Sequence, residues 1–167
     1  MKAILVIILA LLLISCNKEK VLEKYDKNGN LIVYNEQVYA ELWTKDKNLK
    51  VTVIDTFCIN QEIRARKDIR EGKLIYFGYD NYEFQKLSKK LIRYGIESKS
   101  FLRRGVRLGG FDPYCYQNEM RREISRKFGN RFIDSLSQIA KREFLQENPN
   151  IEYMEDGVDL RKKYMVK

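Results

Sequence analysis

The chain has 167 residues, 32 of them Lys or Arg and 23 Asp or Glu, and its formal net charge is +9 at pH 7. It contains no histidine, which excludes Ser-His-Asp triads, Cys-His dyads and histidine-containing zinc sites. We expect no metal or other cofactor, and any catalysis would have to rest on carboxylates, tyrosine, lysine or a cysteine.

The N-terminus has the layout of a secretory signal peptide. Lys2 gives a positive start, an unbroken apolar run covers residues 3–14, and the small residue Ser15 precedes Cys16. The run of about twelve residues is too short to cross a bilayer, which needs about twenty. We therefore expect residues 1–15 to be a signal peptide that is removed.

Residues 13–16, Leu-Ile-Ser-Cys, resemble the lipobox of bacterial lipoproteins. The resemblance implies lipidation of Cys16 with palmitate-type chains, a tether over 16–24, and a protein anchored to a membrane of the cell envelope, on the periplasmic face or at the cell surface. Two later stretches, 112–117 and 128–136, resemble uncharacterised envelope lipoproteins of Bacteroidota. This resemblance brings no activity with it.

An N-terminal hairpin is expected directly after the tether. Asn28-Gly29 is the strongest turn signal in the chain, because this pair suits the positive φ angles of a type I′ turn. Residues 31–34 then have the composition of a strand. A second apolar segment over 37–43 is expected to pair nearby.

Strand and helix signals alternate in the next part of the chain. We predict strands over 49–57, 74–77 and 96–102, separated by helices over 60–71 and 80–95. The short joints that end in glycine favour right-handed crossovers onto one small, mostly parallel sheet, and hence an α/β fold. The alternative is an α+β fold in which the hairpin and the later strands form one antiparallel sheet.

A glycine-rich basic loop over 103–112 is followed by two helices, the first with apolar residues every four positions from Tyr116 to Phe128 and the second capped by Asn130. We expect one α/β domain over 25–147. The remaining residues, 148–167, are predicted to form a charged, loosely held C-terminal tail with a short helix near its end.

Cys58 and Cys115 are the two cysteines left once Cys16 carries lipid. Cys58 is predicted at the carboxyl end of a strand and Cys115 at the amino end of a helix, and in a parallel sheet these ends lie at the same edge. A disulfide between them is therefore possible, and the expected oxidising compartment favours it. Two readings stay open beside it. Both cysteines can be buried free thiols, or Cys115 can be a reactive thiolate activated by the helix N-terminus and nearby arginines.

A binding edge is predicted where strands end, because ligands of open α/β sheets bind at the carboxyl ends of strands. Tyrosines and arginines anchor ligands and partners well. The candidate residues are Tyr79, Asp80, Tyr82, Arg103, Arg104, Arg107, Tyr114 and Tyr116. The alternative is a solvated basic surface with ordinary half-buried tyrosines.

These features predict a lipid-anchored envelope protein that binds a protein or a polymer, for example as an immunity- or inhibitor-like protein. Its basic charge favours an acidic protein or an anionic envelope polymer as partner. Nucleic acid is not expected, because an exported lipoprotein does not meet the chromosome. The alternative is an envelope enzyme, either thiol-dependent through Cys115 or anion-binding. No catalytic residue is assigned.

Overall fold

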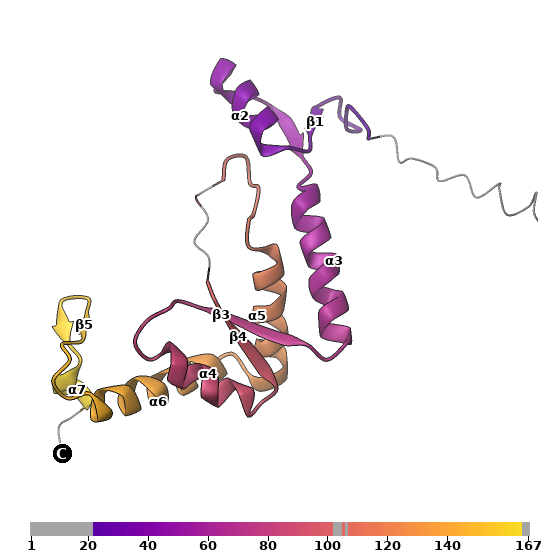
Figure 1. The fold of residues 1–167 in the computed structure, drawn as a ribbon. Helices are drawn as coiled ribbons and strands as arrows, with labels where there is room; N and C mark the ends of the chain where they lie inside the picture. The colour runs from indigo at the N-terminus through magenta and orange to yellow at the C-terminus, as the bar shows by residue number, and fades with distance from the viewer. Residues whose placement is uncertain (1–21, 102–104, 106, 165–167) are drawn as a thin grey trace, which may run out of the picture.

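The computed structural model describes residues 22–101, 105 and 107–164, which form a mixed α/β fold (Figure 1). The α/β class expected from the sequence is thereby confirmed. The predicted signal peptide over 1–15, the lipidation site Cys16 and the loop residues Arg103 and Arg104 lie outside the described residues.

The first unit is a strand, a helix and a second, parallel strand: β1 (Leu31–Val33), α2 (Glu36–Lys45) and β2 (Val51–Val53). The turn before β1 is present and is closed by one antiparallel bridge between Tyr25 and Leu31.

The prediction that residues 37–43 pair as a strand is wrong, because this segment is the helix α2. Its first turn is set by Asn35, whose side-chain oxygen accepts hydrogen bonds from the backbone N–H groups of Gln37 and Val38.

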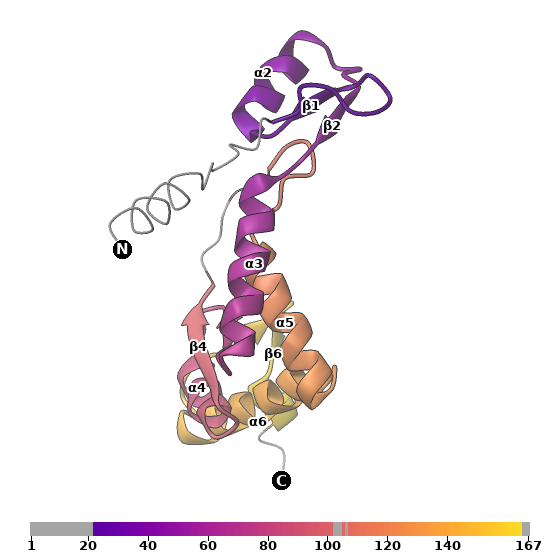
Figure 2. The same cartoon turned by 90° about the vertical axis from the view of Figure 1, so that its right-hand side faces the viewer.

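The long helix α3 (Thr56–Arg70) begins four residues before the predicted Asn60 start. Asp55 is its N-cap, and its carboxylate accepts a 2.9 Å hydrogen bond from the backbone N–H of Cys58. The strand predicted over 49–57 therefore ends early, at Val53. A fifteen-residue helix is about 22 Å long, so α3 carries the chain well away from the first unit (Figure 2).

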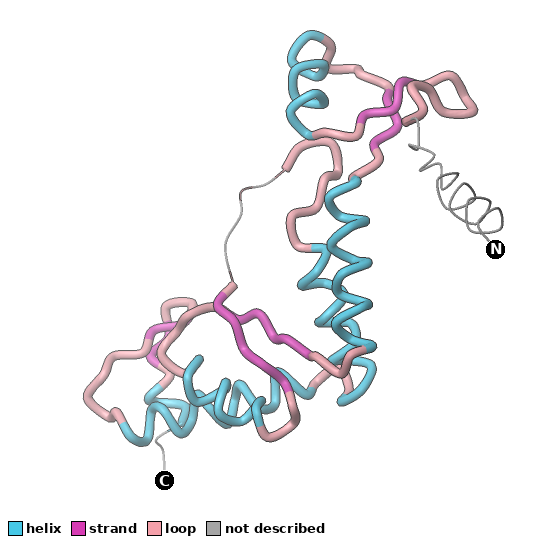
Figure 3. The backbone as a smooth tube through the Cα atoms, turned by 45° about the vertical axis from the view of Figure 1, so that its right-hand side comes forward, coloured by secondary structure: helices cyan, strands magenta, loops and turns pink. Residues whose placement is uncertain are grey.

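The second unit repeats the order of the first: β3 (Leu74–Gly78), α4 (Phe84–Ile92) and β4 (Ile96–Ser100). Its strands are parallel, with Leu74 opposite Ile96 and Phe77 opposite Lys99. The strands thus form separate parallel pairs, β1 with β2 and β3 with β4, and not one continuous sheet (Figure 3). The separation follows from the length of α3.

Two further helices, α5 (Cys115–Phe128) and α6 (Phe132–Glu147), complete the packing around β3 and β4. On one face of the pair, Leu74 and Ile96 pack with α4, α6 and Ile124 of α5. On the other face, Ile75 packs with buried side chains of α3 and α5. The helices α3 and α5 lie side by side along this second face (Figures 1 and 2).

The expectation of a loosely held C-terminal tail is wrong. The tail forms a hairpin of β5 (Met154–Glu155) and β6 (Val158–Asp159), followed by α7 (Arg161–Tyr164). Tyr153 and Leu160 are buried against Phe144 and Leu145 of α6. Burial of these apolar side chains is what holds the tail on the domain. Within the described residues, no helix is both long and apolar enough to cross a membrane.

Candidate anion-binding site

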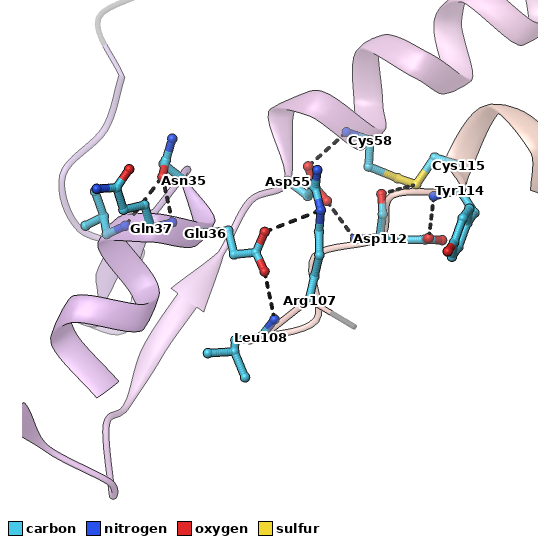
Figure 4. A network of polar contacts seen from close by, with 11 residues as sticks. Asn35, Glu36, Gln37, Asp55, Cys58, Arg107, Leu108, Asp112, Tyr114 and Cys115 are labelled. Atoms are coloured by element: carbon cyan, nitrogen blue, oxygen red, sulfur yellow. Dashed lines mark hydrogen bonds and ion pairs between the residues drawn. A yellow bond between two sulfur atoms is a disulfide. The ribbon is translucent and has the colours of Figure 1, made fainter. Parts of the chain in front are cut away.

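A disulfide joins the amino-terminal ends of α3 and α5. It links Cys58, in the first turn of α3, to Cys115, the first residue of α5, with Cα atoms 5.3 Å apart (Figure 4). The placement of Cys58 at the end of a strand is wrong, because α3 begins before it. The carboxylate of Glu62 and both sulfurs lie within 4.8 Å of one another. Since thiolates ligate metals, the bonded sulfurs do not make this group a metal site.

Two aspartates fix the chain around the disulfide (Figure 4). Asp55 accepts hydrogen bonds from the backbone N–H groups of Cys58 and Asp112, both 2.9 Å long. Asp112 in turn accepts from the N–H of Tyr114, at 2.7 Å, and from the side-chain amide of Asn118, at 2.9 Å. These carboxylates already offset the positive helix ends. The helix N-termini themselves are therefore not free sites for an external anion.

The loop before α5 is held on the first unit by a further contact (Figure 4). Glu36 accepts a 3.0 Å hydrogen bond from the N–H of Leu108 and forms a 3.3 Å ion pair with Arg107. The guanidinium of Arg107 also lies 5.2 Å from the ring centre of Phe57. Arg107, predicted as a binding residue, is thus engaged within the protein.

A basic hollow of about 310 Å³ lies beside these helix ends, on the face of β3 and β4 that α3 and α5 cover. Its apolar floor is formed by Ile75, Phe77 and Tyr116. The rings of Phe77 and Tyr116 meet edge to face, with centres 5.9 Å apart. Tyr116, predicted as a binding residue, therefore supplies part of this floor.

Three cations from three parts of the chain line the basic hollow: Arg64 of α3, Lys73 before β3, and Lys99 of β4. Strand geometry explains the two lysines. Alternate residues of a strand share a face, which places Lys73 with Ile75 and Phe77, and Phe77 lies opposite Lys99 in the ladder. No Asp or Glu is among the lining residues.

The remaining polar groups of the hollow are the side-chain amides of Gln61 and Gln117. Gln61 lies on the same α3 face as Arg64, and Gln117 lies in the first turn of α5. Amides donate hydrogen bonds to carboxylate or phosphate oxygens without adding charge. Together, the cations and amides form a set of donors suited to one anionic group.

Two acidic side chains, Asp68 and Glu97, lie near the hollow without lining it, and Glu97 forms a 3.4 Å ion pair with Lys99. The hydroxyl of Tyr116 donates a 2.6 Å hydrogen bond to Asp68, which lowers the pKa of that carboxyl, and Lys73 and Arg64 lower it further. Burial, together with the hydrogen bond to Asp68, raises the pKa of Tyr116 well above its ordinary value. At neutral pH the pair is therefore a neutral tyrosine and a carboxylate, and the tyrosine offers no base or nucleophile.

The other predicted binding residues are not brought together with Tyr116. Tyr79 lies 5.2 Å from Phe101 between ring centres, and Tyr114 stacks on the same Phe101 at 4.8 Å. They form a separate aromatic row at the carboxyl ends of β3 and β4.

Tyr82 and Asp80 lie apart from this row, although they were predicted at the same edge. The ring of Tyr82 stacks on Phe144 of α6, at 5.4 Å, and so belongs to the packing of the C-terminal segment. Asp80 is an exposed residue of the connection between β3 and α4.

Sequence reasoning missed the residues that build the basic hollow: Gln61, Arg64, Lys73, Lys99 and Gln117. The alternation of Lys73, Ile75 and Phe77 was a usable signal, because it places a cation on the face of a strand that carries apolar residues. The helix predicted to start at Asn60 contained Gln61 and Arg64, but nothing in the sequence said which strand face they would approach.

Comparison with known proteins gives no family: no family model matches the chain, and no match is found among curated proteins or solved structures.

Proposed function

We propose that the chain is a lipid-anchored binding protein of the cell envelope, held by Cys16 after removal of residues 1–15, and that its basic hollow binds an acidic group of an envelope polymer. The observation that carries the proposal is the convergence of Arg64, Lys73 and Lys99 on one hollow with no acidic lining residue. A carboxylate or phosphate there would receive charge-assisted hydrogen bonds, which are among the strongest in proteins.

The chemistry of the lining residues favours binding over catalysis. Both cysteines of the domain are in the disulfide, so neither supplies the thiolate that the alternative thiol enzyme would need. Histidine is absent from the whole chain. Tyr116 is kept neutral by burial and by its hydrogen bond to Asp68. The lining therefore holds cations, amides and apolar side chains, which bind an anion without transforming it.

The size of the hollow favours a polymer over a protein as the partner. A stable protein interface buries about 800 Å² on each side around an apolar centre. The basic hollow is small and has three cations among its lining residues, which suits one acidic group on a flexible chain. An acidic protein is the alternative partner, as expected for an immunity- or inhibitor-like protein, and titration with an acidic polypeptide distinguishes it from a polymer.

Binding is tested by titration calorimetry of the full chain in detergent with polygalacturonate, using polyglutamate as the acidic polypeptide probe. Arg64→Gln and Lys73→Gln should each weaken polygalacturonate binding about tenfold, since a hydrogen bond to a charged group contributes about 1.5–3 kcal/mol. Lys89→Gln is the matched control, because Lys89 is an exposed lysine of α4 that does not line the hollow.

The basic hollow is refuted as the site if Lys89→Gln weakens polygalacturonate binding as much as the hollow variants do. It is also refuted if the double variant Arg64→Gln/Lys73→Gln binds polygalacturonate as tightly as the parent chain. Binding of polyglutamate alone points to a protein partner and refutes the polymer. The anchor is tested separately by metabolic labelling with a palmitate analogue. Incorporation should disappear in Cys16→Ala, and equal labelling of both chains would refute lipidation at that residue.

A further inference from the structure

A second hollow lies at the carboxyl ends of β3 and β4, between α5 and α6. Its volume is about 280 Å³, and we call it the aromatic hollow because Tyr76, Phe77, Tyr79 and Phe101 line it together with Ile133. A cavity of this size accommodates a single small ring rather than a drug-sized ligand. Apart from Phe77, none of its lining residues lines the basic hollow.

Four polar side chains complete the lining of the aromatic hollow: Arg121 and Ser125 of α5, Asn130 of the turn, and Asp134 of α6. None of them has a side-chain hydrogen bond or ion pair to another described residue. Arg121 donates hydrogen bonds and Asp134 accepts them, whereas the hydroxyl of Ser125 and the amide of Asn130 can each do both. The set can therefore serve a ligand whose polar groups both donate and accept.

The charges of the aromatic hollow cancel, in contrast to those of the basic hollow. Arg121 and Asp134 contribute one charge of each sign, and no other ionised residue is among the lining residues. Burial raises the pKa of Tyr76 by more than the nearby Arg121 lowers it, so its hydroxyl stays neutral. An isolated anion or cation gains little net attraction here, whereas a neutral polar ligand keeps all of its hydrogen bonds.

A pyranose ring matches both halves of this lining. One face of the ring carries C–H groups and packs against aromatic side chains, which gain from covering apolar surface. The hydroxyls around its edge each donate and accept, as the four polar side chains require. We propose that the aromatic hollow binds one ring of a neutral saccharide, stacked on Tyr79 and Phe101 and hydrogen-bonded by Arg121, Asn130 and Asp134.

This inference does not depend on the proposed function, because the two hollows are lined by different cations. They nonetheless lie along one side of α5, since Gln117, Arg121 and Ser125 follow each other at four-residue intervals. Gln117 and Ser125 are about 12 Å apart along the helix axis. Neutral probes separate the two sites, because they offer nothing to the cations of the basic hollow.

The test is saturation-transfer NMR on the full chain in detergent, with maltotetraose, cellotetraose and tetra-N-acetylchitotetraose as probes. We expect transfer from aromatic protons to the C–H protons of at least one probe. Asp134→Ala and Arg121→Ala should each weaken its binding about tenfold, the loss expected for a hydrogen bond to a charged group. Arg122→Ala is the matched control, because this exposed neighbour does not line the aromatic hollow.

Three results overturn the inference. One is the absence of transfer to all three probes, and another is equal weakening by Arg122→Ala. The third is displacement of the saccharide by 50-fold excess inorganic phosphate, which would put the sugar in the basic hollow. Circular dichroism checks that each variant is folded, and Asn130→Ala replaces any that is not. Binding of a neutral probe with no binding of polygalacturonate supports the inference while refuting the proposed function.

Discussion

Removing the Cys58–Cys115 disulfide should lower the stability of the protein without unfolding it. The bond closes a loop between residues 57 apart in sequence. In the chain-entropy model, such a loop restricts the unfolded chain enough to stabilise the fold by about 4 kcal/mol. With a urea dependence of about 2 kcal/mol per molar, this loss moves the unfolding midpoint down by about 2 M.

The assay is urea unfolding followed by circular dichroism, with and without a reductant. Reduction should lower the urea midpoint of unfolding of the parent chain by about 2 M. In the Cys58→Ala/Cys115→Ala variant, the midpoint should be low from the start and should not respond to the reductant. This variant shows that the reductant acts through the bond and not elsewhere on the chain.

Two results would refute the reasoning. The first is an unchanged midpoint of the parent chain on reduction. The second is reaction of both sulfurs with a thiol reagent in the folded, unreduced protein. The two helix ends keep other links after reduction, since Asp55 still accepts hydrogen bonds from Cys58 and Asp112. We therefore expect the reduced chain to remain folded at low urea.

Three other perturbations have outcomes that the structure defines. Hydrogen bonds, the strongest of them from Thr52, lower the pKa of Asp26 to about 2. The stabilisation from this carboxylate is therefore present above pH 4 and is lost as the pH falls toward 2. In urea unfolding, the drop in stability between pH 5 and pH 2.5 should be smaller in Asp26→Asn than in the parent chain. Tyr153→Phe removes a 2.6 Å hydrogen bond to the buried Glu83 and should cost about 1–3 kcal/mol by thermal unfolding. Met120→Ala, at a fully buried position, should cost about 2–5 kcal/mol in urea, and a loss below 1 kcal/mol would contradict its place in the core.

The elements that sequence predicted best are those whose signal is local. The apolar run that became β3 and the spacing of Leu87 and Leu91 in α4 both depend on residues close in sequence. The helix α2 was missed because none of its residues is buried, so its apolar side chains show no clear helical face. Its only strong local signal is the cap at Asn35.

The candidate site was harder to predict because it is assembled by long-range register. Lys73 and Lys99 are far apart in sequence and reach one hollow only because β3 and β4 pair in parallel, with Phe77 opposite Lys99. A shift of the ladder by one residue would turn Lys99 to the other face. No local pattern fixes that register. The disulfide, in contrast, was one of three readings of the cysteines, favoured by their number and by the expectation of an oxidising compartment, although the expected place of Cys58 was wrong.

The distribution of positive charge decides what kind of anion the protein can bind. A hollow of about 550 Å³ between α3 and α5 is lined by four arginines, and three of them, Arg66, Arg122 and Arg126, are each ion-paired with a glutamate. Ion pairing within the protein therefore weakens the attraction that these three arginines offer to a ligand. In the basic hollow Lys99 is paired with Glu97, whereas Arg64 and Lys73 have no ion pair among the described residues, and no Asp or Glu lines the hollow. This arrangement favours one discrete acidic group over a broad polyanion surface.

Salt dependence tests this difference. A polyanion that neutralises three cations should bind with a slope of log K against log salt of about −2, and Arg64→Gln should reduce its magnitude by about 0.7. Polygalacturonate titrated between 50 and 300 mM NaCl gives the slope. If the slope is several times steeper, or if Arg122→Gln reduces it as much as Arg64→Gln does, the ligand lies across the paired arginines and the discrete site is refuted.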